Sequence, residues 1–207
     1  MGERTLDEHV EAAVCHFRGY IDGLLEQFEK RQDARRNNGI KVVNFVGHGR
    51  CGKDTSAAHF STLTGAAYGG ATSSIVNPMI AWCLGIDEER SFATRHDNRM
   101  YWFDWCNAFR RKDPSLLCRM LLGQGDICAG TRSHAELTAS LNEKVLDVVV
   151  WINKVDTGID PTMEYDAGDI VNLPFENWSW IDNNKEVSDL YKQVHRLAVS
   201  LDMIKGV

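Results

Sequence analysis

The sequence predicts an α/β fold with a doubly wound, mostly parallel sheet flanked by helices. Three observations carry this prediction. Short apolar runs, typical of strands buried on both faces, alternate with helical patterns along the chain. A glycine-rich turn joins the first of these runs to a helix. An amphipathic pattern precedes the first strand, so we also expect an extra N-terminal helix.

The N-terminal segment carries apolar residues at alternating steps of three and four, which is typical of one side of a helix. This stripe consists of Val10, Val14, Phe17, Ile21, Leu24, Leu25 and Phe28. We expect residues 1–38 to form an amphipathic helix and linker, and residues 39–207 to form the main domain. Either the main domain or a second copy, in a homodimer through this helix, must cover the stripe. The sequence leaves both open.

The remaining elements follow from apolar runs, turn residues and capping patterns. Asn77-Pro78 predicts a helix cap and first turn, and Ser133 with Glu136 resembles a capping box. The expected strands are residues 42–46, 126–130, 148–152 and 178–181. The expected helices are residues 56–63, 77–85, 88–111, 113–122, a segment starting near 133, and 187–201.

The most informative motif is Gly47-His48-Gly49-Arg50-Cys51-Gly52-Lys53-Asp54-Thr55, which lies between a strand and a helix. Its glycines let successive backbone N–H groups line one concavity, and the helix that follows adds its positive end. Lys53 supplies a charge for the outer phosphates. The pattern is that of a phosphate-binding loop (P-loop), so we expect a P-loop NTPase-type fold that binds ATP through residues 47–55.

Asp54 stands where this pattern usually has Ser or Thr as a magnesium ligand. A carboxylate oxygen also suits Mg²⁺, directly or through water. We therefore predict Asp54 as a variant metal ligand and catalytic residue, beside Lys53. The alternative is a glycine-rich turn that merely caps a helix.

Arginines supply the other predicted contacts to phosphate. Arg132 follows the second predicted strand, at the sheet edge where ligands gather, and Glu136 one turn later is its alternative partner. On a continuous helix, Arg95, Arg99 and Trp102 share one side, where they could grip a phosphate and stack on a base. The predicted lid, residues 154–169, contains five acidic side chains and no arginine. The phosphate clamp must therefore come from Arg50, Arg95, Arg99 and Arg132.

Composition narrows the class of protein. The chain has a formal net charge of −6, and six cysteines without a C-x-x-C pair. This balance argues against a surface that is basic throughout, and the cysteines suit free thiols in a reducing compartment. No apolar run is long enough to span a bilayer, so we expect no membrane contact and a cytoplasmic location, in the host cytoplasm if the protein is viral.

Several segments together resemble viral P-loop kinases of the thymidylate and deoxynucleoside monophosphate kinase group, with bacteriophage 5-hydroxymethyldeoxyuridine DNA kinases the most similar. They are GHGRCGKDT, TRHDNRMYWFDWCNAFRRKDPSLL, GDICAGTRSHAEL followed by VVVWI, and DPTMEYD with the later WIDNN. The resemblance spans roughly residues 40–200. It implies that ATP and Mg²⁺ are used to phosphorylate the hydroxymethyl group of a modified uracil in phage DNA, a step of thymine hypermodification.

The residues themselves do not select the acceptor. A hydroxymethyl acceptor would benefit from a carboxylate that receives its proton, and Asp54 and Asp104 are candidates. A base within DNA must also be exposed, which Trp102 and the arginines could assist. A free deoxynucleoside monophosphate (dNMP) needs no such base. Three functions stay open: the DNA kinase, a dNMP kinase, and a nucleotide-binding protein or ATPase without an acceptor.

Overall fold

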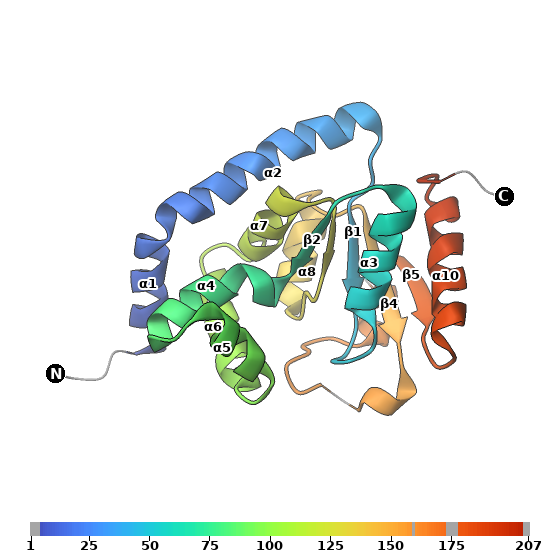
Figure 1. Cartoon of the computed structure of the whole chain (residues 1–207). Helices are drawn as coiled ribbons and strands as arrows, with labels where there is room; N and C mark the ends of the chain where they lie inside the picture. Colours follow the sequence, from blue (N-terminus) through green and yellow to red (C-terminus); the bar gives the residue numbers. More distant parts are fainter. Residues whose placement is uncertain (1–4, 159, 173–177, 205–207) are drawn as a thin grey trace.

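The computed structural model describes residues 5–158, 160–172 and 178–204. Five strands in these residues form one sheet in the order β2-β3-β1-β4-β5, and every pair is parallel. Helices flank this sheet (Figure 1). The strands are β1 (Val43–Val46), β2 (Tyr68–Ala71), β3 (Ile127–Ala129), β4 (Val148–Asn153) and β5 (Trp178–Asp182). The predicted α/β class is confirmed, and the sheet is entirely parallel.

Helices account for most of the rest of the described chain. None of those described is long and apolar enough to cross a membrane. They are α1 (Leu6–His16), α2 (Arg18–Asn38), α3 (Lys53–Thr64), α4 (Thr72–Leu84), α5 (Glu88–Ala93), α6 (Arg99–Arg110), α7 (Leu116–Gln124), α8 (His134–Asn142), α9 (Ala167–Asn172) and α10 (Val187–Ser200), with short 3-10 turns η1 (Thr94–His96) and η2 (Val155–Thr157).

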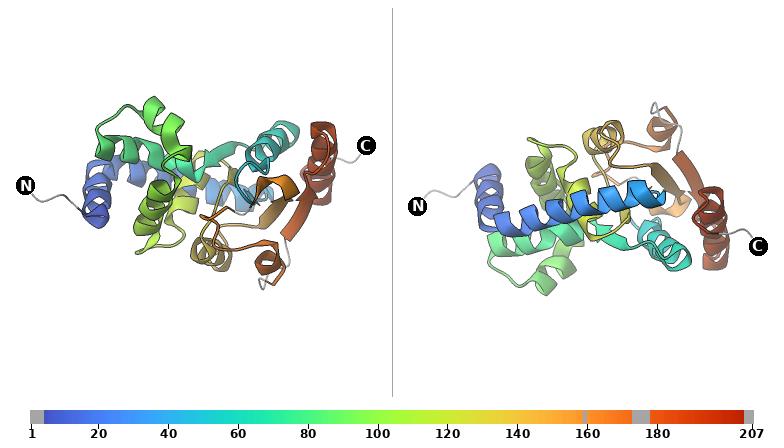
Figure 2. Two further views of the ribbon diagram at one scale, coloured as in Figure 1. Left: turned by 90° about the horizontal axis from the view of Figure 1, so that it is seen from below. Right: turned by 90° about the horizontal axis from the view of Figure 1, so that it is seen from above.

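The three central strands, β1, β3 and β4, are buried on both faces of the sheet. Along β1, Val43 and Phe45 belong to one apolar cluster, together with Phe60 of α3 and Val194 of α10. The alternate positions face the other way, and Val149 of β4 belongs to a larger cluster with α7, α8 and the N-terminal helices. In Figure 2, α3 and α10 lie together at one end of the molecule and α1 at the other. Because β1 is central, the loop after it opens at the middle of the sheet edge.

The N-terminal segment forms two helices rather than the single one expected. The chain leaves helical geometry at Phe17, where φ is −95° and ψ is 15°. The apolar stripe packs onto the main domain, since Val10, Ile21 and Phe28 are buried in its larger cluster. This is the first of the two alternatives for covering the stripe. A homodimer through this segment stays a prediction.

Helix α2 lies along α7 and is fixed there by a close approach and an ion pair (Figure 2). A Cβ on Gly123 of α7 would lie 2.2 Å from the carbonyl oxygen of Leu24, so the two helices meet backbone to backbone. Arg35 is 4% exposed, and its Nε lies 2.8 Å from a carboxylate oxygen of Asp126. Its guanidinium also donates to two carbonyl oxygens, those of Leu122 and Gly125.

The sequence patterns did not predict one strand, β2, or the residue at which α4 begins. Strand β2 has the sequence Tyr-Gly-Gly-Ala, which lacks an apolar run. A Cβ at Gly69 would lie 2.4 Å from the carbonyl oxygen of Leu121, so β2 needs glycine to sit against α7. Helix α4 begins at Thr72 and contains Pro78, so the expected start at Asn77 is wrong. The Asn77 amide instead donates to the carbonyl oxygen of Glu88, 3.0 Å away.

The continuous helix expected over residues 88–111 is also wrong. It is interrupted between α5 and α6, where side chains compete with the backbone for hydrogen bonds. The Thr94 hydroxyl donates to the carbonyl oxygen of Arg90, and the side-chain amide of Asn98 donates to the carbonyl oxygen of Thr94. The break divides the segment into two helices, α5 and α6, joined by η1.

Arg35→Met is expected to lower the free energy of unfolding by about 3 kcal/mol, because it removes the closer and more deeply buried of the two cations that pair with Asp126 and leaves only Arg31, at 3.5 Å. Urea unfolding followed by tryptophan fluorescence measures the change. Arg36 is exposed on the same helix, and Arg36→Met should change stability by less than about 0.5 kcal/mol. Equal losses in the two variants would contradict the assigned role of the ion pair.

Candidate functional site

The loop after β1 runs too close to its surroundings for side chains at two positions. Gly47 has a φ of 141°, and a Cβ there would lie 2.6 Å from the carbonyl oxygen of Ile152 in β4. A Cβ on Gly49 would lie 2.7 Å from the guanidinium of Arg99. The loop backbone therefore passes directly between β4 and an arginine from α6.

The end of the loop is braced by the segment after β5. The side-chain amide of Asn183 donates to the carbonyl oxygen of Cys51, 2.8 Å away. The Cys51 side chain is buried, and burial raises the pKa of its thiol. Gly52 precedes the first turn of α3, so the unpaired N–H groups of that turn open beside the loop. Loop and helix terminus are arranged as an anion-binding site requires.

Lys53 is a buried cation at the start of α3. It is 7% exposed, and its Nζ lies 3.5 Å from the carbonyl oxygen of His48. Among the described residues, no carboxylate lies within ion-pair distance of it. Burial lowers the pKa of Lys53, because removal from water disfavours its charged form. An anionic ligand would supply the missing counter-charge.

Two arginines from different elements converge on one carboxylate beside the loop. Arg99 at the start of α6 and Arg132 after β3 both form ion pairs with Oδ2 of Asp160. The backbone N–H of Gly49 donates to the same oxygen, at 3.0 Å. Thr162 accepts a hydrogen bond from Arg132 at 2.8 Å. A backbone amide of the loop and two guanidinium groups therefore already hold an anionic oxygen.

The Asp160 carboxyl is strongly biased toward its charged form. Burial by itself would raise its pKa, but hydrogen bonds and charge from Arg132, together with hydrogen bonds from Thr162, outweigh burial. The pKa of Asp160 is held far below its usual range. Its side chain is only 2% exposed, so the arginines replace the water that would otherwise stabilise the charge.

Arg132 is positioned by a polar network behind it. Asn44 in β1 donates to the hydroxyl of Thr131 at 2.9 Å, and the Tyr165 hydroxyl donates to the carbonyl oxygen of Thr131 at 2.7 Å. Both bonds are buried, so Thr131 is fixed between the central strand and the segment before α9. The adjacent Arg132 consequently leaves the sheet edge toward the loop.

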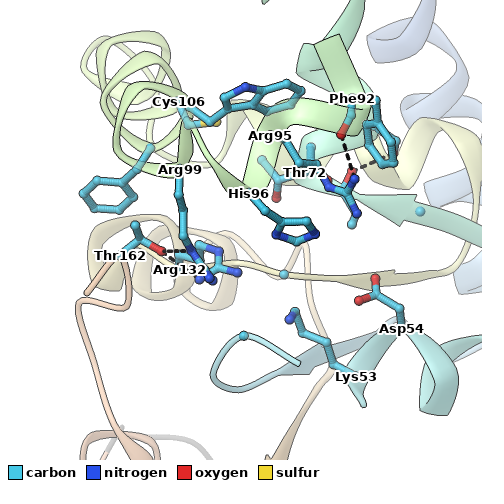
Figure 3. A pocket seen from close by; sticks show the side chains of 18 of the residues that line it. Lys53, Asp54, Thr72, Phe92, Arg95, His96, Arg99, Cys106, Arg132 and Thr162 are labelled. Atoms are coloured by element: carbon cyan, nitrogen blue, oxygen red, sulfur yellow. Dashed lines mark hydrogen bonds between the residues drawn. The ribbon is translucent and has the colours of Figure 1, made fainter. Parts of the chain in front are cut away.

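A cavity of about 580 Å³ joins these groups to an aromatic region. Figure 3 shows Lys53 and Asp54 on one side of it and Arg99, Arg132 and Thr162 on another. His96 points into the space between them (Figure 3). Much of the rest of the wall is aromatic or carries hydroxyl groups, and Arg95, Cys106 and Arg110 also line it. The aromatic and hydroxyl-bearing residues include Tyr68, Thr72, Ser73, Ser74, Phe92, Trp102 and Phe103. The cavity thus has a cationic end beside the loop and an aromatic end.

The predicted group of Arg95, Arg99 and Trp102 lines this cavity, although not from one helix side. Arg95 lies on η1, and only Arg99 and Trp102 lie on α6. Arg95 donates to the carbonyl oxygen of Phe92 at 2.7 Å, and its guanidinium carbon lies 3.8 Å from the centre of the Phe92 ring. Trp102 is 7% exposed and meets Phe92 edge to face. Arg95 is therefore engaged locally, and Arg99 alone of the two arginines reaches the loop.

Glu136 is neither a helix cap nor the partner of Arg132. Helix α8 does begin after Ser133, but the Ser133 side chain makes no capping bond. Glu136 is fully buried, and its carboxylate lies 2.7 Å from the guanidinium of Arg110, which is buried as well. Burial raises the pKa of Glu136, with Arg110 acting against that shift. This pair forms part of the wall behind the cavity, because Arg110 also lines it.

Asp54 is the carboxylate that lines the described cavity, whereas Asp104 is exposed and does not line it. The Tyr68 hydroxyl donates to Oδ1 of Asp54 at 3.0 Å, and burial raises the pKa of Tyr68, so it stays a donor. No group of three or more metal-ligating side chains occurs among the described residues. One carboxylate with a free oxygen fits Mg²⁺ that is held mainly by phosphates and water. Asp54 as metal ligand stays a prediction.

The other residues of the predicted loop take different positions. The His48 ring accepts a hydrogen bond from the Asp160 backbone N–H at 3.4 Å, so it ties the loop to that segment. Arg50 is exposed, has a φ of 63° and lines the cavity. Thr55 is exposed on α3 and does not line the cavity.

Sequence reasoning missed Asp160, Tyr68, Phe92 and His96. Asp160 lies in a segment rich in acidic residues, where a carboxylate is usually solvated. One signal for it was available: a segment with five acidic side chains lies after β4 and must pass close to the arginines at the same sheet edge. Tyr68 was missed together with its strand.

Searches of protein-family models, curated proteins and solved structures found no match to this chain.

Lys53→Met is expected to raise the free energy of unfolding of the ligand-free protein by about 0.5 to 2 kcal/mol, because it replaces a buried, unpaired ammonium with an apolar chain of similar length. Urea unfolding measures this change. Lys185→Met at an exposed position is the control and should have almost no effect. A clear loss of stability in Lys53→Met would show that Lys53 has a stabilising partner in the empty site.

Proposed function

We propose that this protein is an ATP-dependent phosphotransferase that moves the γ-phosphoryl group of ATP to a deoxynucleotide acceptor. One observation carries the proposal: a buried, unpaired lysine and two converging arginines surround a loop whose backbone amide already binds an anionic oxygen. Phosphoryl transfer depends mainly on positioning the phosphates and neutralising their charge. These residues supply both.

In this proposal each group has a defined part. The N–H groups of the loop and of the first turn of α3 bind the β- and γ-phosphates, and Lys53 reaches their outer oxygens. Arg99 and Arg132 stabilise the charge on the transferring group. Asp54 would hold Mg²⁺ with the phosphates, and the ion would neutralise charge on their oxygens. The aromatic end of the cavity would receive the acceptor.

The favoured acceptor is the 5-hydroxymethyl group of 5-hydroxymethyldeoxyuridine in phage DNA, and it comes from the resemblance described above. A hydroxyl acceptor needs a group that takes its proton, and Asp54 and His96 both line the cavity. Burial and the charges of Arg95, Arg99 and Arg50 lower the pKa of His96, with Asp97 opposing them. His96 is therefore neutral near pH 7 and able to accept a proton.

A free dNMP is the second candidate acceptor, and two observations favour it. Trp102 of α6 is buried with its ring against that of Phe92, which makes it a poor platform for a base entering from a DNA strand. Arg110 is buried with Glu136, so it adds nothing to a surface that would follow a DNA backbone. A phosphate acceptor would need no proton-accepting group.

Radiolabelled ATP offered with hydroxymethyluracil DNA, unmodified DNA or each dNMP separates these functions. Label on modified DNA supports the favoured acceptor, and a labelled diphosphate supports the second. Release of free phosphate alone would indicate an ATPase. No transfer and no hydrolysis by folded protein with Mg²⁺ would contradict the proposal.

Arg132→Ala is expected to lower the turnover number by about 100- to 1,000-fold, because it removes a preorganised donor from the transferring group. The turnover number with the acceptor found above measures this. Arg111 is exposed, and Arg111→Ala is the control, with turnover expected near that of the unaltered protein. Arg132→Ala with normal turnover would remove this residue from the proposed mechanism.

A further inference from the structure

We infer that the Asp160 carboxylate is an exchangeable internal anion, which binds the donors meant for a phosphoryl group and gives them up when a polyphosphate binds. This inference rests on the proposed function in one respect, namely that the ligand is a phosphate. It adds a positioning residue that the phosphate-binding motif does not contain.

The contacts of Asp160 are those that a phosphoryl group would make. Oδ2 accepts from the Gly49 backbone N–H and from both guanidinium groups, those of Arg99 and Arg132. Oδ1 accepts from Thr162, at 2.7 Å from its hydroxyl and 3.1 Å from its backbone N–H. Loop amides and guanidinium groups are the donors that phosphate oxygens prefer. Two anions cannot use the same donors at once.

Charge explains why the cations around Asp160 need such an anion. Arg50, Lys53, Arg99 and Arg132 all line the same cavity. Arg132 disfavours the charged form of Arg99, while Asp160 favours it. Without Asp160 the two guanidinium groups would repel each other. With it, they are held near Gly49 before any ligand arrives.

Charge also explains why the exchange favours the ligand. A triphosphate brings several negative charges to this cluster, whereas Asp160 brings one, and only the triphosphate can also reach Lys53. Besides the carboxylate, both arginines contact Thr162, whose hydroxyl oxygen accepts from Arg132 at 2.8 Å and from Nε of Arg99 at 3.4 Å. The arginines therefore keep part of their support when the carboxylate leaves.

An internal competitor lowers the apparent affinity of the ligand, because the ligand binds only molecules whose donors are free. Removing the competing charge should therefore strengthen binding. A carboxylate that stays in place as a fixed support makes the opposite prediction, because its loss would loosen the arginines and weaken binding. The sign of the change separates the two roles.

The test is the affinity of Asp160→Asn for inorganic tripolyphosphate, measured by titration calorimetry. We expect binding about tenfold tighter than in the unaltered protein. Asp156 is exposed in the same acidic segment, and Asp156→Asn is the control for the change in net charge, with an expected change below about twofold. Weaker or unchanged binding by Asp160→Asn, or tightening shared by Asp156→Asn, would overturn the inference.

A measurement on the unaltered protein covers the case in which Asp160→Asn does not fold. The ¹³C shift of the Asp160 carboxyl, followed against pH, reports its pKa. With saturating tripolyphosphate this pKa should rise toward the ordinary range for aspartate, because the carboxylate has left the two guanidinium groups. A pKa that stays low in the complex would mean that Asp160 keeps its partners, and would overturn the inference.

These readouts are independent of phosphate transfer. Tighter tripolyphosphate binding by Asp160→Asn in a protein that phosphorylates none of the acceptors would support the internal anion and contradict the kinase. A working kinase in which Asp160→Asn binds tripolyphosphate more weakly would support the proposed function and contradict the internal anion. If neither the unaltered protein nor Asp160→Asn binds tripolyphosphate, both the proposed function and the internal anion are contradicted.

Discussion

Six cationic side chains line one cavity, and the mutual repulsion of four of them is the constraint around which this site is built. Arg50, Lys53, Arg99 and Arg132 come from the loop after β1, from α3, from α6 and from the end of β3. A fold brings such groups together only if packing elsewhere holds their elements in place and if an anion offsets part of their charge. The parallel pairing of β1 with β3 and β4 holds the elements in place, and the Asp160 carboxylate offsets part of the charge.

The parts of the fold that sequence reasoning captured are those set by local chemistry. Strands β1, β3, β4 and β5 follow apolar runs, and the turn from β1 into α3 follows its glycines. What escaped depends on tertiary contacts. Strand β2 has glycine where another backbone approaches, and α4 begins at Thr72 and so carries Pro78 in its interior, where local propensity disfavours proline. In both places packing decides the structure and the local pattern gives no sign of it.

The residues of the candidate site also fall into two groups, those that local sequence patterns locate and those that depend on tertiary contacts. The loop, Lys53 and the arginine after β3 were predictable, since the motif and the position at a strand end locate them. The grouping of Arg95 with Arg99 was wrong in detail because residues between α5 and α6 bond to the local backbone. Asp160 and Glu136 show most clearly what sequence patterns cannot predict. Which carboxylate pairs with which arginine depends on the approach of segments 25 or more residues apart.

The anchoring of α2 also bears on how the chain can be divided. Residues 1–38 read as an appendage to the main domain, yet Arg35 closes a buried network around the residue that leads into β3. Trimming the chain after Asn38 would leave Asp126 without a cation and would uncover the apolar surface of α7 that α2 now shields. Because β3 leads directly to Thr131 and Arg132, the damage would lie on the strand that positions one of the four clustered cations. The N-terminal helices are thus a structural support of the sheet edge, and a fragment without them would be a poor substitute for the whole molecule.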